Sequence, residues 1–396
     1  MPINDIRHTA GRKRAATAFA AEPRHGGPGL AERLGGILAA IARHLDYPLL
    51  AMLITLMLLS LFVQYSAADE NMPHLLMHAA NMLVALLLLV AVANVPPPYL
   101  KSLAVPAYAV GVILLVGVAL FGDVVNGSRR WLHLGPVRLQ PSEILKLAAP
   151  LLLAWYFQIH EASLPLKHYA IASILLVVPV LLVARQPDLG TAMLIAASGF
   201  YVLFLAGLPW RILLGAIVLA AGSAPLVWHF LHDYQKKRIL TLLDPMQDPL
   251  GAGYHIIQSS IAIGSGGVFG KGWLHGTQAH LDFLPEHTTD FVFAVFGEEF
   301  GLMGSVLLSL LYLAIVLRGL AIAARAPDLF ARLLSGSITL AFFTYALVNM
   351  GMVSGILPVV GVPLPMMSYG GSAMVIVMLG FGMVMSVKTH RKLNKS

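Results

Sequence analysis

The chain has 396 residues, of which 58% are hydrophobic and 11% are charged, and its formal net charge is +7 at pH 7. An ordinary soluble domain has about 25% charged residues, so this composition excludes a chain of soluble domains and predicts a polytopic membrane protein. The absence of cysteine excludes disulfides and cysteine-ligated metals. The positive charge does not indicate nucleic acid, because basic residues on cytoplasmic flanks would produce it.

The chain divides into a membrane domain and two polar ends. Residues 1–45 are basic, rich in alanine and glycine and without periodicity, which predicts a disordered cytoplasmic tail. They contain no apolar run of the kind that a cleaved signal peptide needs, so the first membrane helix is expected to act as an anchor. Residues 46–387 are expected to form one membrane domain, and residues 388–396 a short cytoplasmic tail.

Long apolar runs predict the membrane-spanning helices, since about 17–25 apolar residues are needed to cross a bilayer. The expected fold is an all-α polytopic membrane protein of about ten transmembrane helices. A large extracytoplasmic loop, 231–290, lies between the seventh and the eighth helix. The expected helices are 47–66, 76–95, 103–121, 142–158, 168–184, 189–207, 211–230, 291–317, 331–357 and 370–387.

The orientation follows from lysine and arginine in the short loops and tails. Both tails and the connection between the eighth and ninth helices are basic, and an even number of helices places all three on one side, which we assign to the cytoplasm. The short loop 122–141 then lies outside, although it carries Arg129 and Arg130 against the usual bias. These arginines would bind either an anion, such as the phosphate of a lipid substrate, or ordinary lipid headgroups.

Asp290 is the first candidate for chemistry. It belongs to the stretch LPEHTTDFVFAVFGEEFG, residues 284–301, where a polar loop enters an apolar helix. A helix cap explains an aspartate there, and a general base does so equally, because partial burial would raise the pKa of the carboxyl. Glu298 and Glu299 are expected to face the interior of the bundle in a structural role.

Further polar residues interrupt the apolar sequence. Glu143 and Lys146 are three apart on one helical face, which indicates a local ion pair; the alternative places Lys146 in a cavity, where it would meet a pyrophosphate. Gln186 and Asp188 lie in a break between two apolar runs, and Asp188 would cap the next helix. Trp131 is typical of an anchor at the membrane interface.

Two further segments of the sequence are rich in glycine. Residues 253–278 do not form a phosphate loop, because Lys271 is followed by glycine and not by serine or threonine. Their histidines also lack metal-ligand spacing, so an interfacial or re-entrant segment is the better interpretation. Residues 349–374 indicate a broken helix and a tight outer loop, although close helix packing alone would explain the glycines.

Five segments in order resemble the SEDS family of cell-shape, elongation and division proteins, and the RodA branch in particular. They are SRRWLHLGPVRLQPSEILKLA, QPDLGTA, DPLGAGYHIIQSSIAIGSGGVFGKGWLHGTQ, FLPEHTTDFVFAVFGEEFG and GMVSGILPVVGVPLPMMSYGGSA. The resemblance implies a ten-helix peptidoglycan glycosyltransferase that polymerises lipid II during cell elongation. The family's catalytic aspartate, in its PE-x-x-T-D motif, falls on Asp290, and its important tryptophan after the arginine pair falls on Trp131. The chain departs from the family where Thr288 replaces the usual histidine before Thr289.

A mechanism built on this resemblance and on the polar residues above gives a set of expected site residues. Asp290 would be the base, and cations would stabilise the leaving pyrophosphate, with Arg129, Lys146 and Lys271 as candidates. A divalent cation, Mg²⁺ or Mn²⁺, is left open, with no metal ligand assigned and no organic cofactor expected. The expected substrate-binding residues are Arg129, Trp131, Lys146, Gln186, Asp188, Gln258, Lys271, Glu286 and Ser368.

The implied partners follow from the same resemblance. The substrates would be lipid II and a glycan linked to undecaprenyl pyrophosphate, and the protein partners a class B penicillin-binding protein and other elongation-complex proteins. The protein would lie in the inner (cytoplasmic) membrane of a bacterium, surrounded by membrane lipid, with both termini cytoplasmic. The alternatives are a lipid II flippase and another lipid transporter. A transporter of the secondary class should show inverted repeats, and none is visible in the sequence.

Overall fold

The computed structural model describes residues 43–125, 128–134, 137–230, 233–249, 251–281, 283–284 and 286–390. Most of the expected N-terminal tail and the last six residues therefore lie outside the described residues. The expected all-α membrane fold is confirmed, and each of the ten expected helices is present, although α4 begins six residues earlier and α12 ends seven residues later than expected. These helices are α2 (Tyr47–Ala67), α3 (Met72–Ala93), α4 (Pro97–Phe121), α5 (Pro141–Ile159), α6 (Leu166–Ala184), α7 (Leu189–Leu205), α8 (Trp210–Phe230), α12 (Val292–Ala324), α13 (Leu329–Val353) and α14 (Gly371–Thr389).

Hydropathy and capping explain why these helices form where they do. Seven of the described helices are long and apolar enough to cross a membrane, and α7 and the first part of α8 are apolar but shorter. In hydrocarbon every backbone group must be hydrogen-bonded within the segment, which a helix achieves. Aspartates accept a backbone N–H at three helix starts, Asp46 for α2, Asp188 for α7 and Asp328 for α13. The expected cap of α12 by Asp290 is wrong, because the helix begins after Phe291 and has no side-chain cap.

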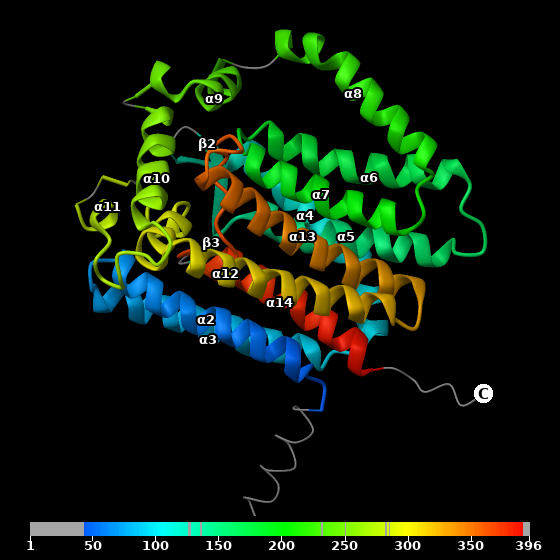
Figure 1. Cartoon of the computed structure of the whole chain (residues 1–396). Helices are drawn as coiled ribbons and strands as arrows, with labels where there is room; N and C mark the ends of the chain where they lie inside the picture. Colours follow the sequence, from blue (N-terminus) through cyan, green and yellow to red (C-terminus); the bar gives the residue numbers. More distant parts are fainter. Residues whose placement is uncertain are drawn as a thin grey trace, which may run out of the picture. The chain divides into compact units, whose positions relative to one another are not determined.

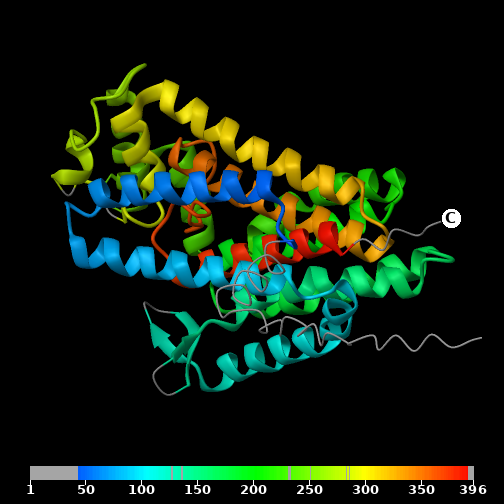
Figure 2. The same cartoon turned by 90° about the horizontal axis from the view of Figure 1, so that it is seen from below.

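The helices pack lengthwise in pairs (Figure 1, Figure 2). The most extensive pairs are α3 with α14, α12 with α13, and α4 with α5. Helix α5 also contacts α6, α7, α13 and α14, so it lies in the middle of the bundle and is buried over most of its length. By contrast, most of the described side chains of α8 are exposed. The interior is therefore organised around α5, α13 and α14.

An ion cluster ties three helices together at the end of the bundle opposite Asp290. The buried carboxylate of Asp46 accepts two hydrogen bonds from Arg318, at 3.1 and 2.8 Å, and another from Lys388. Burial alone would raise the pKa of Asp46, but the hydrogen bonds from Arg318 and Lys388 hold it below its ordinary value. The start of α2 and the end of α14 therefore lie at the same end, as an even number of crossings requires.

A small antiparallel sheet occupies the loop between α4 and α5, and the sequence did not predict it. Its strands are β1 (Asp123–Val125), β2 (Ser128–Leu134) and β3 (Val137–Leu139), in the order β1-β2-β3. Asp123 pairs with Trp131, and Leu132 pairs with Leu139. The sheet gives the arginine pair and Trp131 a defined place near the start of α5.

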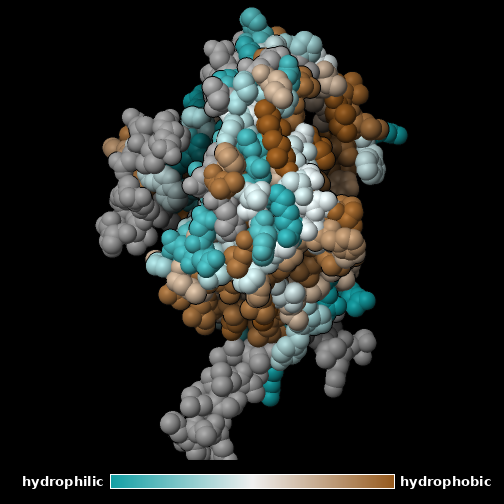
Figure 3. Space-filling view, turned by 60° about the vertical axis from the view of Figure 1, so that its left-hand side comes forward, coloured by the Kyte–Doolittle hydropathy of each residue, from teal (hydrophilic) through white to brown (hydrophobic). Residues whose placement is uncertain are grey.

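The long loop before α12 is also structured. It contains α9 (Asp233–Leu243), a 3₁₀ turn (Pro245–Gln247), α10 (Ala252–Gly266) and α11 (Thr277–His280). Helix α10 packs against α12, and hydrophilic residues gather on the face that carries this loop (Figure 1, Figure 3). The glycines after α10 permit a backbone contact, since a Cβ on Gly270 (φ +81°) would lie 2.0 Å from the carbonyl oxygen of Glu299. The glycine-rich segment therefore serves close packing on α12.

Candidate active site

A polar cavity of about 300 Å³ lies at the Asp290 end of the bundle. Its walls come from β2, the starts of α5 and α7, the segment before α12 and the loop between α13 and α14. Five side chains carry its chemistry: Arg130, Trp131, Lys146, Asp188 and Asp290. Four of them were expected from the sequence, and Arg130 was expected only as a neighbour of Arg129.

Asp290 places its carboxylate on the wall of this cavity. Burial, together with the negative charge of Glu286, raises the pKa of Asp290 to about 6. Within the described chain no hydrogen-bond donor contacts this carboxylate. Gly361, at φ +71°, lies against it, since a Cβ there would be 3.4 Å from Asp290 Oδ2. The arrangement leaves a partly desolvated carboxylate whose oxygens are available to a bound molecule.

Glu286 lies four residues before Asp290 and is exposed. Its backbone adopts φ +53°, and its carboxylate accepts a hydrogen bond from the Thr289 hydroxyl at 2.8 Å. That bond holds the turn that leads into Asp290. Glu286 does not line the polar cavity as described, so its effect on Asp290 is electrostatic.

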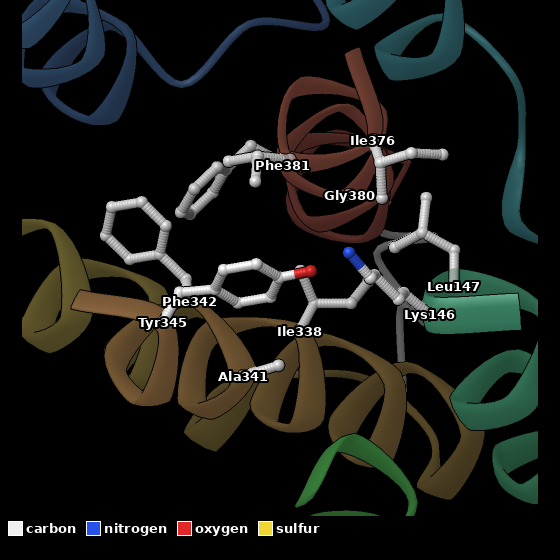
Figure 4. Close-up of a pocket in the computed structure, with 10 residues that line it drawn as sticks. Lys146, Leu147, Ile338, Ala341, Phe342, Tyr345, Ile376, Gly380 and Phe381 are labelled. Carbon is white, nitrogen blue, oxygen red and sulfur yellow. The ribbon is translucent and has the colours of Figure 1, made fainter. Parts of the chain in front are cut away.

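Lys146 supplies a positive charge on another wall of the cavity. Its Nζ lies 2.5 Å from Glu143 Oε1, and both side chains are nearly buried, so the expected local ion pair is confirmed. Figure 4 shows the amino group directed toward the hydroxyl of Tyr345, between α13 and α14. Lys146 also borders a hollow of about 30 Å³, lined mostly by apolar residues such as Ile376 and Phe381. It thus lies at the junction of a polar cavity and an apolar one.

Arg130 provides the second cation. It donates a hydrogen bond from Nη2 to the Pro187 carbonyl at 2.8 Å, and its Nη1 lies 3.8 Å from Asp188 Oδ2. Its Nε is buried and has no partner in the described chain. Arg129 belongs to the same strand, β2, and its side chain is outside the described part of the structure. The sequence pointed to the arginine pair, and the structure places Arg130 on the cavity wall.

Lys271 lies elsewhere and bonds to one of the two interior glutamates. Its Nζ is 2.6 Å from Glu298 Oε1, and Glu298 also accepts from the backbone N–H groups of Thr277 and Gln278, at 2.9 and 3.1 Å. Glu299 accepts from the N–H of Leu274 at 3.2 Å and from the Ser66 hydroxyl. Both acids are buried, as expected, and they anchor the loop after α10 to α12.

Three other expected substrate-binding residues do not line the polar cavity. Gln186 is buried and donates to the carbonyl of Leu115 at 3.3 Å. Ser368 is also buried and accepts from the N–H of Leu364 at 2.8 Å, inside the turn of its own loop. Gln258 is half-buried in α10. Gln186 and Ser368 thus hold backbone in place.

Fold and site together define a polytopic membrane protein with a partly buried carboxylate and two cations around one polar cavity. Residues 43–393 match the cell cycle protein family FtsW/RodA/SpoVE. The chain is 52% identical to the peptidoglycan glycosyltransferase MrdB of Escherichia coli K12, over 88% of this chain and 95% of that protein. It is 30% identical to the peptidoglycan glycosyltransferase RodA of Treponema pallidum, over 87% and 98% of the two chains.

Comparison with solved structures points to the same family. A chain from a peptidoglycan synthase complex that coordinates polymerization and crosslinking matches with a TM-score of 0.76 and 34% identity, over 88% of this chain and 99% of that one. The rod shape determining protein RodA of Thermus thermophilus matches with a TM-score of 0.66 and 30% identity, over 88% and 98%. The chain belongs to the FtsW/RodA/SpoVE family. These relatives confirm the expected glycosyltransferase activity in peptidoglycan synthesis.

Proposed function

We propose that this chain polymerises lipid II into glycan strands and that Asp290 is the general base of the reaction. One observation carries the proposal: a carboxylate whose pKa is raised to about 6 lies on the wall of a polar cavity that also contains Arg130 and Lys146. A base with this pKa is mostly ionised at neutral pH and still accepts a proton readily.

The proposed reaction is a glycosyl transfer at this carboxylate. Asp290 takes the proton from the 4-hydroxyl of the acceptor's N-acetylglucosamine. That oxygen forms a bond to C1 of N-acetylmuramic acid at the end of the growing strand. The bond from C1 to the pyrophosphate oxygen breaks, and undecaprenyl pyrophosphate leaves with the electron pair. No oxidant, reductant or further reactant is needed.

The two cations fit the leaving group. Developing charge on a pyrophosphate is stabilised by guanidinium and ammonium groups that are already in place and shielded from water. Arg130 approaches from β2 and Lys146 from α5, so they meet the cavity from two different elements.

A divalent cation, Mg²⁺ or Mn²⁺, is part of the proposal only as a companion of the substrate's phosphates. In the described chain no three histidine, cysteine or acidic side chains are grouped to hold a metal ion. Glu143 is paired with Lys146, and Asp188 accepts the N–H of Thr191. The described residues thus offer no group of three such ligands, and the steps above do not depend on a metal.

The proposed setting is the inner membrane of a bacterium, with both termini in the cytoplasm. The ion cluster at Asp46 supports a common side for the two termini, and the basic residues near it support the cytoplasmic side. We also propose a class B penicillin-binding protein as partner, within an elongation complex. The likeness to a chain of a complex that couples polymerization to crosslinking supports this partner.

The test uses purified protein and labelled lipid II, with products separated on a gel. Asp290→Asn is expected to reduce polymer formation by about 10²-fold or more, as loss of a general base does. Asp69→Asn, in an exposed turn, is the matched control and should keep wild-type activity. Polymer at the wild-type rate from Asp290→Asn would refute the assignment. Translocation of lipid II in vesicles without any polymer from wild-type protein would instead support a flippase.

A further inference from the structure

Gln64 is a buried amide in the middle of apolar sequence. It lies near the end of α2, and its side chain is fully buried. Its Nε2 donates to two carbonyl oxygens, those of Thr288 at 2.8 Å and Met367 at 2.9 Å. The first belongs to the segment that carries Asp290, and the second to the loop between α13 and α14. Gln64 therefore bridges two loops that are far apart in the sequence.

Asn349 makes the equivalent bridge from another helix. It is fully buried in α13, and its Nδ2 donates to the carbonyl oxygens of Asp290 and Val362, both at 2.8 Å. As with Gln64, one acceptor lies in the catalytic segment and the other in the loop between α13 and α14. The two amides thus repeat the same connection at two points, on helices that approach the loops separately.

These bridges are the only hydrogen bonds that the two amides make in the described chain. The amide oxygens of Gln64 and Asn349 are buried and have no partner there. Leaving a polar atom buried and unpaired costs about 1–3 kcal/mol, so packing alone would favour a leucine or methionine at these positions. A side-chain NH₂ group offers two donors on one nitrogen, which suits it to join two carbonyls. A side-chain amide is therefore suited to join the catalytic segment to the loop between α13 and α14.

We propose that Gln64 and Asn349 are positioning residues that hold Asp290 at the wall of the polar cavity by tying its segment to the loop between α13 and α14. The proposal rests on the function proposed above for Asp290. Neither amide lines the cavity, so neither is a catalytic residue. Because the Asp290 carboxylate has no donor of its own in the described chain, its position depends on its backbone, which these bridges fix. A displacement of about 1 Å at a reacting group can lower a rate by about 10²-fold.

The test compares Gln64→Met and Asn349→Leu, which keep the approximate volume and remove the donors. Each is expected to lower kcat for lipid II polymerisation by about 10- to 100-fold, with KM changed less than about twofold. The acid limb of the pH–rate profile should move to lower pH, because a loosened carboxylate regains water. The double variant should lose less than the product of the two single losses, since both bridges restrain one segment.

Gln158→Met is the matched control. The side-chain oxygen of this amide accepts a hydrogen bond from the N–H of Phe330 at 2.8 Å, at the end of α5 and the start of α13, away from the polar cavity. Its loss should leave kcat and the pH profile unchanged. Thermal unfolding identifies variants that do not fold. In that event Asn349→Ser, which keeps one donor, replaces Asn349→Leu and should show a smaller fall in kcat at unchanged KM.

Wild-type kcat in the folded single variants would overturn the proposal, and so would a loss confined to KM or an unshifted pH profile. The outcome is separable from that of the proposed function. If Asp290→Asn is inactive while the amide variants are fully active, only the positioning role is wrong. If Asp290→Asn is active, the proposed base is wrong whatever the amide variants do.

Discussion

The ionised carboxylate of Asp290 should lower the free energy of unfolding of this protein. Asp290→Asn is therefore expected to make the protein more stable while removing its activity. The pKa of this group is raised from 3.8 to about 6 by burial and by Glu286. Each pKa unit corresponds to about 1.4 kcal/mol, so the ionised carboxylate destabilises the folded state by up to about 3 kcal/mol above pH 7. Asparagine has nearly the same shape and no charge, and it avoids this cost.

The sign of the pH dependence follows from proton uptake. Between about pH 4 and pH 6 the folded state holds a proton on Asp290 that the unfolded state has already lost. The group therefore favours folding at low pH, and this contribution is lost as the pH rises through about 6. The advantage of Asp290→Asn over wild type should be about a third of its full value near pH 4.5 and full at pH 8.

Thermal unfolding of the detergent-solubilised proteins measures this difference. For a chain of this size a gain of about 3 kcal/mol should raise Tm by a few degrees, roughly 3–6 °C at pH 8. Asp69→Asn should raise Tm far less than Asp290→Asn does at pH 8, since Asp69 is an exposed residue whose charge burial does not penalise. A variant that is less stable than wild type at pH 8, or a gain that is the same at pH 4.5 and pH 8, would refute the reasoning, because the carboxylate would then not be desolvated.

Two further predictions concern the neighbouring acids. Glu286→Gln removes the negative charge that helps to raise the pKa of Asp290, so the acid limb of the polymerisation rate should move to lower pH; an unmoved limb in a full pH profile would contradict this. Glu298→Ala leaves the donors of Lys271 and Thr277 without their buried partner and should destabilise the protein by about 3–5 kcal/mol. Lys271→Met leaves the backbone donors in place and should cost clearly less, about 1–2 kcal/mol, in the same thermal unfolding assay.

The helices were predictable because the bilayer restricts what an apolar run can do. A run long enough to cross hydrocarbon must satisfy its backbone internally, so it forms a helix whatever its neighbours are. Local signals then place the ends, as the Asp188 cap does for α7. The end of α12 was harder to place, because its apolar sequence continues to Ala324, well beyond the thickness of a bilayer.

The identity of the cavity-lining arginine was less accessible to sequence reasoning. The sequence indicated that the pair at Arg129 and Arg130 matters, because the pair opposes the charge bias of a short outer loop. The small sheet places Arg130 on the cavity wall, and its strands are too short and too polar to stand out from a loop in the sequence.

Contacts between residues far apart in the sequence explain the remaining differences between the expected roles and the structure. Lys271 was a candidate cation for the leaving pyrophosphate, but its partner in the structure, Glu298, is supplied by the following membrane helix. Gln64 and Asn349 were missed because each stands alone in an apolar run. A signal was present, since polar side chains at membrane depth are costly and usually have a function. Their partners are backbone carbonyls, which a sequence does not display.

Hydrogen-bond donors separate the roles of the three acids in the stretch from Leu284 to Gly301. Glu298 is surrounded by donors from the loop after α10, and Glu299 accepts at Oε1 from the N–H of Leu274 in the same loop, so both acids are already hydrogen-bonded to the protein. Asp290 lies about two helical turns earlier and has none in the described chain, which leaves its oxygens for a substrate hydroxyl. The anchored glutamates hold the first turns of α12 firmly against the loop. The three acids therefore differ in role: Glu298 and Glu299 fix the start of α12 against the loop, and Asp290 is the acid that remains for a bound molecule.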